Sequence, residues 1–147
     1  AAGEEISFSQ DDIKLNGHSI ECRINAEDPF RNFMPSPGKI SHLHLPHGLG
    51  IRIDEGIYEG YEVPFYYDSL LFKISTWGRT REQAIQRMRR ALNETVVDGI
   101  STNLPFQRAV INDEQFNRGS YTTHFIDERK IMYKLEAPVQ DNTGFRG

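Results

Sequence analysis

A chain of 147 residues is enough for one domain, and its 37% hydrophobic content is too high for a disordered segment. The net charge of −4 gives no basic excess of the kind that nucleic-acid-binding domains carry, so no nucleic-acid partner is expected. No segment approaches the roughly 20 consecutive apolar residues of a membrane helix and no secretory signal opens the chain, so no membrane partner is expected.

The cysteine count indicates the redox compartment of the protein. Cys22 is the only cysteine, which excludes an internal disulfide and a thiolate metal site and fits a reducing compartment. We therefore expect a cytoplasmic protein.

The chain begins with Ala1–Glu5, without Met, and these residues resemble the end of a helix that is closed by Gly3. This start predicts a piece cut from a longer protein.

The first half of the chain has the patterns of strands. Ser19–Asn25 alternates, which places Ile20, Cys22 and Ile24 on one face and Glu21, Arg23 and Asn25 on the other. Further along, Ser36–Gly38 forms a turn and Lys39–Leu45 is extended.

Two more strands are expected before the middle of the chain. The turn His47–Gly50 leads into an alternating run, with apolar Leu49, Ile51 and Ile53 against polar Arg52 and Asp54. Leu70–Trp77 is a fourth strand, richer in apolar residues and more buried.

The period becomes helical after Gly78. Thr80 and Gln83 form a capping box. An apolar stripe follows, made of Ala84, Ile85, Met88, Ala91, Leu92 and Val96, and Gly99 lies just past its end. The opposite face carries five arginines, which we expect to be solvated: Arg79, Arg81, Arg87, Arg89 and Arg90.

A second helix is expected from Asn103, its N-cap, with Pro105 in the first turn and an apolar stripe of Phe106, Val110 and Ile111. A short turn at Asp113–Arg118 stops at Gly119. Residues 131–147 form a polar tail of unknown order, so the domain is expected to cover residues 1–130. Strands first and two to three helices second, without regular alternation, predict an antiparallel α+β domain rather than a Rossmann-type sheet.

Few residues suggest chemistry by their pattern alone. His42, His44 and His47 lie close together, but no carboxylate or thiol stands at ligand spacing among them, so no metal site is expected. The carboxylate pairs Asp11–Asp12 and Glu27–Asp28 are sequence neighbours in turns, which disfavours acid–base pairing.

Arg23 is the exception, because it projects from the middle of a strand on the polar face. A guanidinium on a rigid strand is well placed to hold an anion with a planar fork of donors. The alternative, which the residues alone favour, is that Arg23 pairs with a neighbouring carboxylate.

Five blocks of the sequence resemble a known family in the family's own order. They are Gly17–Pro29, Met34–Ile40, Tyr66–Leu71, Asp98–Asn103 and Thr122–Phe125. The first resembles the G-H-(A/S)-x-E-x-R-(I/L)-x-A-E-(D/N)-P signature of biotin carboxylases, and together the blocks resemble that family's C-terminal domain. The resemblance implies the antiparallel α+β fold of that domain.

The resemblance also implies a reaction and its partners. Family members cleave ATP with Mg2+, activate bicarbonate as carboxyphosphate, and carboxylate the ureido N1 of biotin on a carrier protein that also serves a carboxyltransferase. Arg23 matches the arginine that lies beside biotin and bicarbonate and stabilises the enolate oxygen of deprotonated biotin. The ATP-binding portion lies upstream in the family, so the isolated chain is expected to bind none of these cofactors and to be inactive.

The resemblance also predicts roles for four more residues. Asp68 is expected near the biotin pocket, with a strand-end turn as the alternative. Leu49 and Arg52 occupy positions that help to form a two-fold dimer in a bacterial branch of the family. Thr123 is expected at the edge of the adenine pocket.

Two other interpretations of the chain are kept. It could serve chiefly as a module for dimerisation or carrier docking, or it could be the C-terminal domain of another ATP-grasp ligase. The final carboxyl acceptor is left open among acetyl-CoA, propionyl-CoA, methylcrotonyl-CoA, pyruvate and urea.

Overall fold

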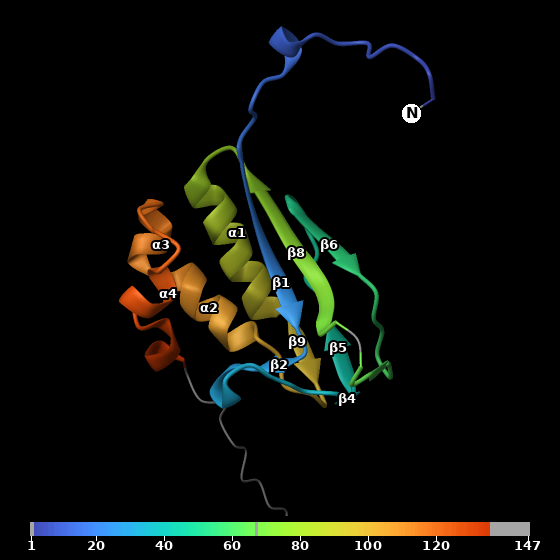
Figure 1. The fold of residues 1–147 in the computed structure, drawn as a ribbon, viewed down its shortest axis with the longest axis vertical. Coiled ribbons are helices and arrows are strands. Elements are labelled where there is room, and N and C mark those ends of the chain that lie inside the picture. The colour runs from blue at the N-terminus through green and yellow to red at the C-terminus, as the bar shows by residue number, and fades with distance from the viewer. Residues whose placement is uncertain (1, 67, 136–147) are drawn as a thin grey trace, which may run out of the picture.

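The centre of the fold is a three-stranded antiparallel sheet covered by one long helix. A computed structural model describes residues 2–66 and 68–135. The sheet has the order β1 (His18–Asn25), β8 (Leu70–Gly78) and β6 (Ile51–Glu55), and α1 (Arg81–Glu94) packs against one of its faces (Figure 1). This architecture confirms the predicted antiparallel α+β class.

Three short two-stranded ladders extend the fold at one end of the sheet (Figure 1). All three are antiparallel. They pair β2 (Glu27–Asp28) with β3 (Met34–Pro35), β4 (Gly38–Lys39) with β7 (Glu62–Val63), and β5 (His42–His44) with β9 (Val96–Asp98). The single extended segment expected at residues 39–45 is therefore divided between two ladders.

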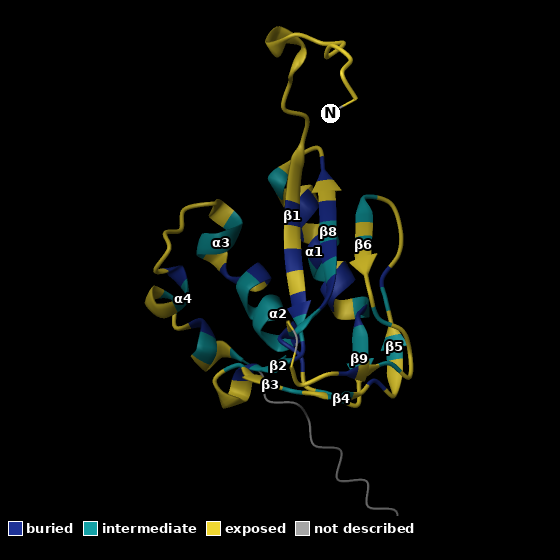
Figure 2. Cartoon of the chain, turned by 45° about the vertical axis from the view of Figure 1, so that its right-hand side comes forward, coloured by how far each residue is buried: buried dark blue, intermediate teal, exposed yellow. Residues whose placement is uncertain are grey.

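The remaining helices lie on the side of α1 away from β6 (Figures 1 and 2). They are α2 (Leu104–Asn112), α3 (Glu114–Arg118) and α4 (Phe125–Glu128). Three single turns of 3-10 helix complete the fold: η1 (Gln10–Asp12), η2 (Pro29–Arg31) and η3 (Ile131–Lys134). The pattern of the sequence did not predict α4.

Residues 2–17 form an exposed arm that reaches away from the sheet (Figure 2). The arm joins the body where the Trp77 indole Nε1 donates a hydrogen bond to the Asn16 carbonyl oxygen, 2.9 Å away. At the junction Gly17 has a φ of +77°, and a Cβ there would come within 2.5 Å of the Gly78 oxygen. A glycine is therefore required at this position.

The alternation of β1 creates one half of the core. Ile20, Cys22 and Ile24 are all buried beneath α1, as predicted, while the residues between them face solvent. Burial, helped by the nearby Glu21 charge, raises the pKa of the Cys22 thiol to about 12. Cys22 is therefore an apolar core residue rather than a reactive thiolate.

The central strand β8 supplies the other half of the hydrophobic core. Phe72, Ile74 and Thr76 are almost fully buried because β8 has a strand on each side and α1 across one face. A buried hydroxyl must find a partner, and Thr76 Oγ1 donates to the Ala84 oxygen of α1 at 3.0 Å. This bond fixes the helix against the middle of the sheet.

The two ends of α1 differ from the prediction. Thr80 Oγ1 accepts from the Gln83 N–H at 3.3 Å, but the Gln83 side chain accepts from the Arg79 N–H instead of completing a capping box. The helix ends at Glu94, so the inclusion of Val96 in its stripe was wrong. Val96 begins β9, and Gly99 follows that strand rather than the helix.

The expectation of a solvated arginine face on α1 was also wrong for three residues. Arg81 Nη2 donates to the Phe116 oxygen at 2.7 Å, and Arg89 Nη2 donates to Asn117 Oδ1 at 2.8 Å. Arg87 donates to the Trp77 oxygen. These guanidinium groups satisfy carbonyls and an amide on neighbouring elements, so they join α1 to β8 and α3.

The segment after Lys130 is folded as far as the structure describes it. Ile131 is fully buried, and Lys134 Nζ binds Asp113 Oδ2 at 2.5 Å. Arg129 Nε binds the same carboxylate at 3.1 Å. Burial alone would raise the pKa of Asp113, but the hydrogen bonds from Lys134, Arg129 and the Gln115 N–H hold it at about 2. Residues 136–147 of the expected tail lie outside the described residues.

Candidate active-site surface

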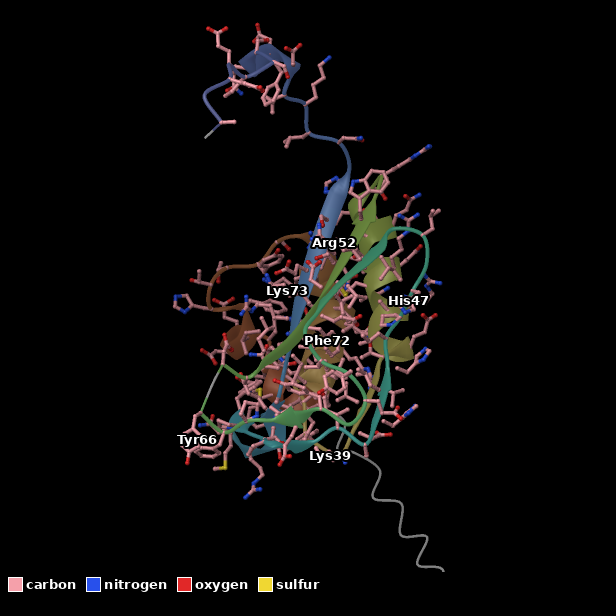
Figure 3. The ribbon with its side chains drawn as sticks, turned by 90° about the vertical axis from the view of Figure 1, so that its right-hand side faces the viewer. Lys39, His47, Arg52, Tyr66, Phe72 and Lys73 are labelled. Carbon is pink, nitrogen blue, oxygen red and sulfur yellow. The ribbon has the colours of Figure 1, made fainter. Side chains whose placement is uncertain are left out.

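The face of the sheet opposite α1 carries two rows of polar side chains. Directly opposite residues of antiparallel strands point to the same face. The ladders therefore align Glu21, Ser75 and Arg52 in one row and Arg23, Lys73 and Asp54 in the next. Figure 3 shows Arg52 and Lys73 along this face, while the labelled Phe72 is buried.

Two of the five charges in these rows form an ion pair within the face. Arg52 Nε binds Asp54 Oδ1 at 2.8 Å, and Ser75 Oγ contacts Glu21 Oε2 at 3.4 Å. The Arg52–Asp54 ion pair neutralises the β6 side of the face.

Arg23 has a different environment. Its side chain is exposed, and across residues 2–66 and 68–135 the guanidinium has neither a hydrogen bond nor an ion pair. The described residues thus do not support the alternative in which a neighbouring carboxylate neutralises Arg23. A fork of donors on a paired strand can therefore receive an anion from outside the domain.

Lys73 is the residue of this surface that the sequence interpretation missed. It lies directly opposite Arg23 in the ladder between β1 and β8, so the two cations share one row. Its only local signal is a single cation in the apolar run Leu70–Trp77. The importance of that signal depends on the strand register, which local periodicity does not supply.

Asp68 lies at the same end of the sheet as Arg23. Its Oδ1 accepts from the Leu70 N–H at 3.0 Å, which is the bond expected of the strand-end turn alternative. The next residue, Ser69, accepts from the Ala26 N–H through its carbonyl oxygen at 2.7 Å, so the turn is attached to the end of β1. Asp68 is exposed, and Tyr67 lies outside the described residues.

Leu49 and Arg52 border the other side of the face. Leu49 is 84% exposed in the turn before β6, so its expected place in the alternating apolar run was wrong. Arg52 lines a shallow concavity of about 520 Å³ between β1 and β6, together with Trp77 and Ser19. Leu49 directly precedes Gly50, which lines the same concavity.

Thr123 is not part of this surface. It is exposed in the turn before α4, and Figures 1 and 2 place α4 on the opposite side of the molecule from β6. The candidate residues therefore separate into a sheet-face group and an isolated position near the C-terminal helices.

Of the three neighbouring histidines His42, His44 and His47, His42 is bound to a carboxylate. His42 Nδ1 lies 2.9 Å from Glu59 Oε2, and this bond, with one from the Leu43 N–H, lowers the pKa of Glu59. Within the described parts of the chain, no three His, Cys, Asp or Glu side chains are grouped so as to hold a metal ion. In those same parts, every helix is too short or too polar to cross a bilayer.

The fold and site define an α+β domain whose end strand β1 presents an arginine that has no partner among residues 2–66 and 68–135. The chain belongs to the biotin carboxylase C-terminal domain family, whose sequence profile matches residues 21–128. This match confirms the resemblance and removes the interpretation as a domain of a different ATP-grasp ligase.

Individual relatives agree with the family match. The chain is 54% identical over 132 residues to a biotin carboxylase of Haemophilus influenzae, covering 90% of this chain and 29% of the relative. It is 48% identical over 132 residues to biotin carboxylase 1 of Bacillus subtilis, covering 90% of this chain and 29% of the relative. The chain thus spans less than a third of the length of these relatives.

Solved structures show the same fold. The biotin carboxylase domain dimer of Hydrogenobacter thermophilus 2-oxoglutarate carboxylase, in complex with MgADP and bicarbonate, superposes with a TM-score of 0.88 at 41% identity, covering 92% of this chain and 30% of that one. For the pyruvate carboxylase of Rhizobium etli the TM-score is 0.81 at 43% identity, covering 84% of this chain and 12% of that one.

Proposed function

We propose that this chain is the C-terminal portion of an ATP-dependent biotin carboxylase and that Arg23 is its contribution to catalysis. The observation that carries the proposal is the exposed guanidinium without a partner in the described residues. Support comes from the family match over residues 21–128 and from a related domain described in complex with MgADP and bicarbonate.

The chemistry of biotin explains why a fixed cation is useful here. A ureido N–H is a very weak acid, and removing its proton places negative charge on the ureido oxygen. Arg23, beside that oxygen, would stabilise the charge as it develops, most strongly where a second domain excludes water. Lys73, in the same row, adds positive potential for bicarbonate.

The remaining components belong to the rest of the proposed enzyme. Biotin on a carrier protein, ATP with Mg2+, bicarbonate and a carboxyltransferase are the cofactors and partners we propose, in the cytoplasm. The described residues offer no acidic cluster for Mg2+, so we assign metal binding to other parts of the enzyme. The isolated chain is proposed to be inactive, and Asp68 and Thr123 are proposed to border the biotin and adenine sites.

The test is Arg23→Ala in the full-length carboxylase. Because an oxyanion-stabilising donor is lost, the rate of biotin carboxylation should fall on the order of 100- to 1,000-fold while the KM for ATP stays within about twofold. Carboxybiotin formation from labelled bicarbonate measures the first quantity. Arg118→Ala is the matched control, since Arg118 is an exposed arginine paired with Glu114 on α3. Equal rates for Arg23→Ala and the parent would remove the proposed role.

A second role for the sheet face is dimerisation through Leu49 and Arg52. The exposure of Leu49 favours it, and a related biotin carboxylase domain is described as a dimer. Sedimentation of the full-length protein should show a two-fold assembly that Leu49→Asp weakens by at least about tenfold, since a charge would then replace an apolar contact. A parent that remains monomeric at high concentration would contradict this role.

A further inference from the structure

The outer edge of β1 beside Arg23 is paired with a side chain instead of a strand. β1 is the end strand of its sheet, so the peptide groups of its outer edge need other partners. Asn103 Nδ2 donates to the Arg23 carbonyl oxygen at 3.1 Å, and Asn103 Oδ1 accepts from the Asn25 N–H at 3.0 Å. The Asn103 N–H in turn donates to the Asn25 oxygen at 3.1 Å.

The carboxamide of Asn103 is committed to β1 although it occupies a capping position. Asn103 directly precedes α2, where an asparagine side chain usually accepts from the first helical N–H groups. Here its side chain makes no capping bond. The residue is only 7% exposed, so both ends of the amide are used within the protein. The side-chain bonds of Asn103 thus serve the strand and not the helix.

A second side chain from α2 strengthens this attachment. Gln107, one turn further along the helix, donates through Nε2 to the same Arg23 oxygen at 3.2 Å. Two donors satisfy both lone pairs of that carbonyl. The peptide of Arg23 is therefore held by β8 on one side and by α2 on the other.

The guanidinium itself has no hydrogen bond in the described residues, so within them only the backbone fixes the point and the face of β1 from which the side chain leaves the strand. We propose that Asn103 is a positioning residue for the reaction: by holding the peptide groups of Arg23 and Asn25, it aims the Arg23 guanidinium at the biotin ureido oxygen. This inference rests on the proposed function of Arg23 and extends it to a residue 80 positions away in the sequence.

The test is Asn103→Ala in the full-length carboxylase, alone and combined with Arg23→Ala. A displaced catalytic group typically costs on the order of 10- to 100-fold in rate, so kcat for biotin carboxylation should fall by that factor with the KM for ATP unchanged. In the Arg23→Ala background, Asn103→Ala should cost less than about twofold, because the group that it aims is already absent.

Asn117→Ala is the matched control. The Asn117 carboxamide also makes several hydrogen bonds, accepting from Arg89 and donating to the Ile111 oxygen, but on α3, away from β1. Its loss should lower thermal stability and leave kcat within about twofold. If Asn103→Ala does not fold, Gln107→Ala takes its place, with an expected loss of about threefold in kcat that again disappears in the Arg23→Ala background.

The outcomes separate the two proposals. A large loss for Arg23→Ala would overturn the positioning role alone if kcat is unchanged in Asn103→Ala, or in Gln107→Ala where that variant takes its place. A loss of equal size in the presence and absence of Arg23, or an equal loss for Asn117→Ala, would show a structural role only and would also overturn it. No effect of Arg23→Ala would overturn the proposed function itself.

Discussion

Two regions of the molecule hold charged side chains in opposite ways. Beneath α4 and η3, the Asp113 carboxylate is 1% exposed and is bound by two cations and a backbone N–H. On the sheet face, the Arg23 guanidinium is exposed and has no partner among residues 2–66 and 68–135. A charge that is paired inside the fold is committed to the fold, whereas a cation left unpaired on a strand is available to a ligand.

Removing the buried charge gives the larger expected effect on stability. Asp113→Ala should lower the free energy of unfolding by about 2 kcal/mol, because it removes the acceptor of the Gln115 N–H at the start of α3 and the carboxylate that Arg129 and Lys134 share. Arg23→Ala should change it by less than about 0.5 kcal/mol, as for surface substitutions without partners. Urea unfolding of the parent, Asp113→Ala and Arg23→Ala measures both changes in the free energy of unfolding. A loss of stability in Arg23→Ala as large as that in Asp113→Ala would show that the Arg23 side chain is also paired within the fold.

The pH dependence of stability gives a smaller, sharper test. The pKa of Asp113 is lowered from 3.8 to about 2, so between these values the unfolded chain binds more protons than the folded one. The stabilisation from Asp113 is therefore complete above about pH 4 and is lost as the pH falls toward 2.

The measurement is the stability difference between the parent and Asp113→Ala, followed by urea unfolding at several pH values. That difference should be constant from pH 7 to about pH 5 and should shrink below about pH 4. A difference that grows as the pH falls would show that the carboxylate is not held in its charged form.

Much of the sheet could be predicted because its signals are local. The alternation of Ile20, Cys22 and Ile24 fixes which face of β1 is buried, and it places Arg23 on the other face without any tertiary information. The stripe of α1 was predicted for the same reason. The five sequence blocks identified the family, which the profile match confirms.

The features that were missed depend on pairings across long stretches of sequence. Val96 was assigned to the helix because its spacing fits, but pairing with His44 makes it part of β9. Lys73 gains its place only from the ladder with β1. Asn103 has the identity and position of an N-cap, and nothing local indicates that its amide bonds the backbone of a strand. Periodicity describes one element at a time, whereas these roles join two elements.

The charge order of the sheet face has a directional consequence. Across one row, Arg23 and Lys73 are positive and Asp54 is negative, and Asp54 is already bound by Arg52. Because neighbouring strands lie about 4.8 Å apart, the electric potential changes over a distance comparable to the size of one small anion. An anion that approaches this face meets the positive charges of Arg23 and Lys73 at the boundary between β1 and β8, beside a β6 side on which Arg52 and Asp54 neutralise each other.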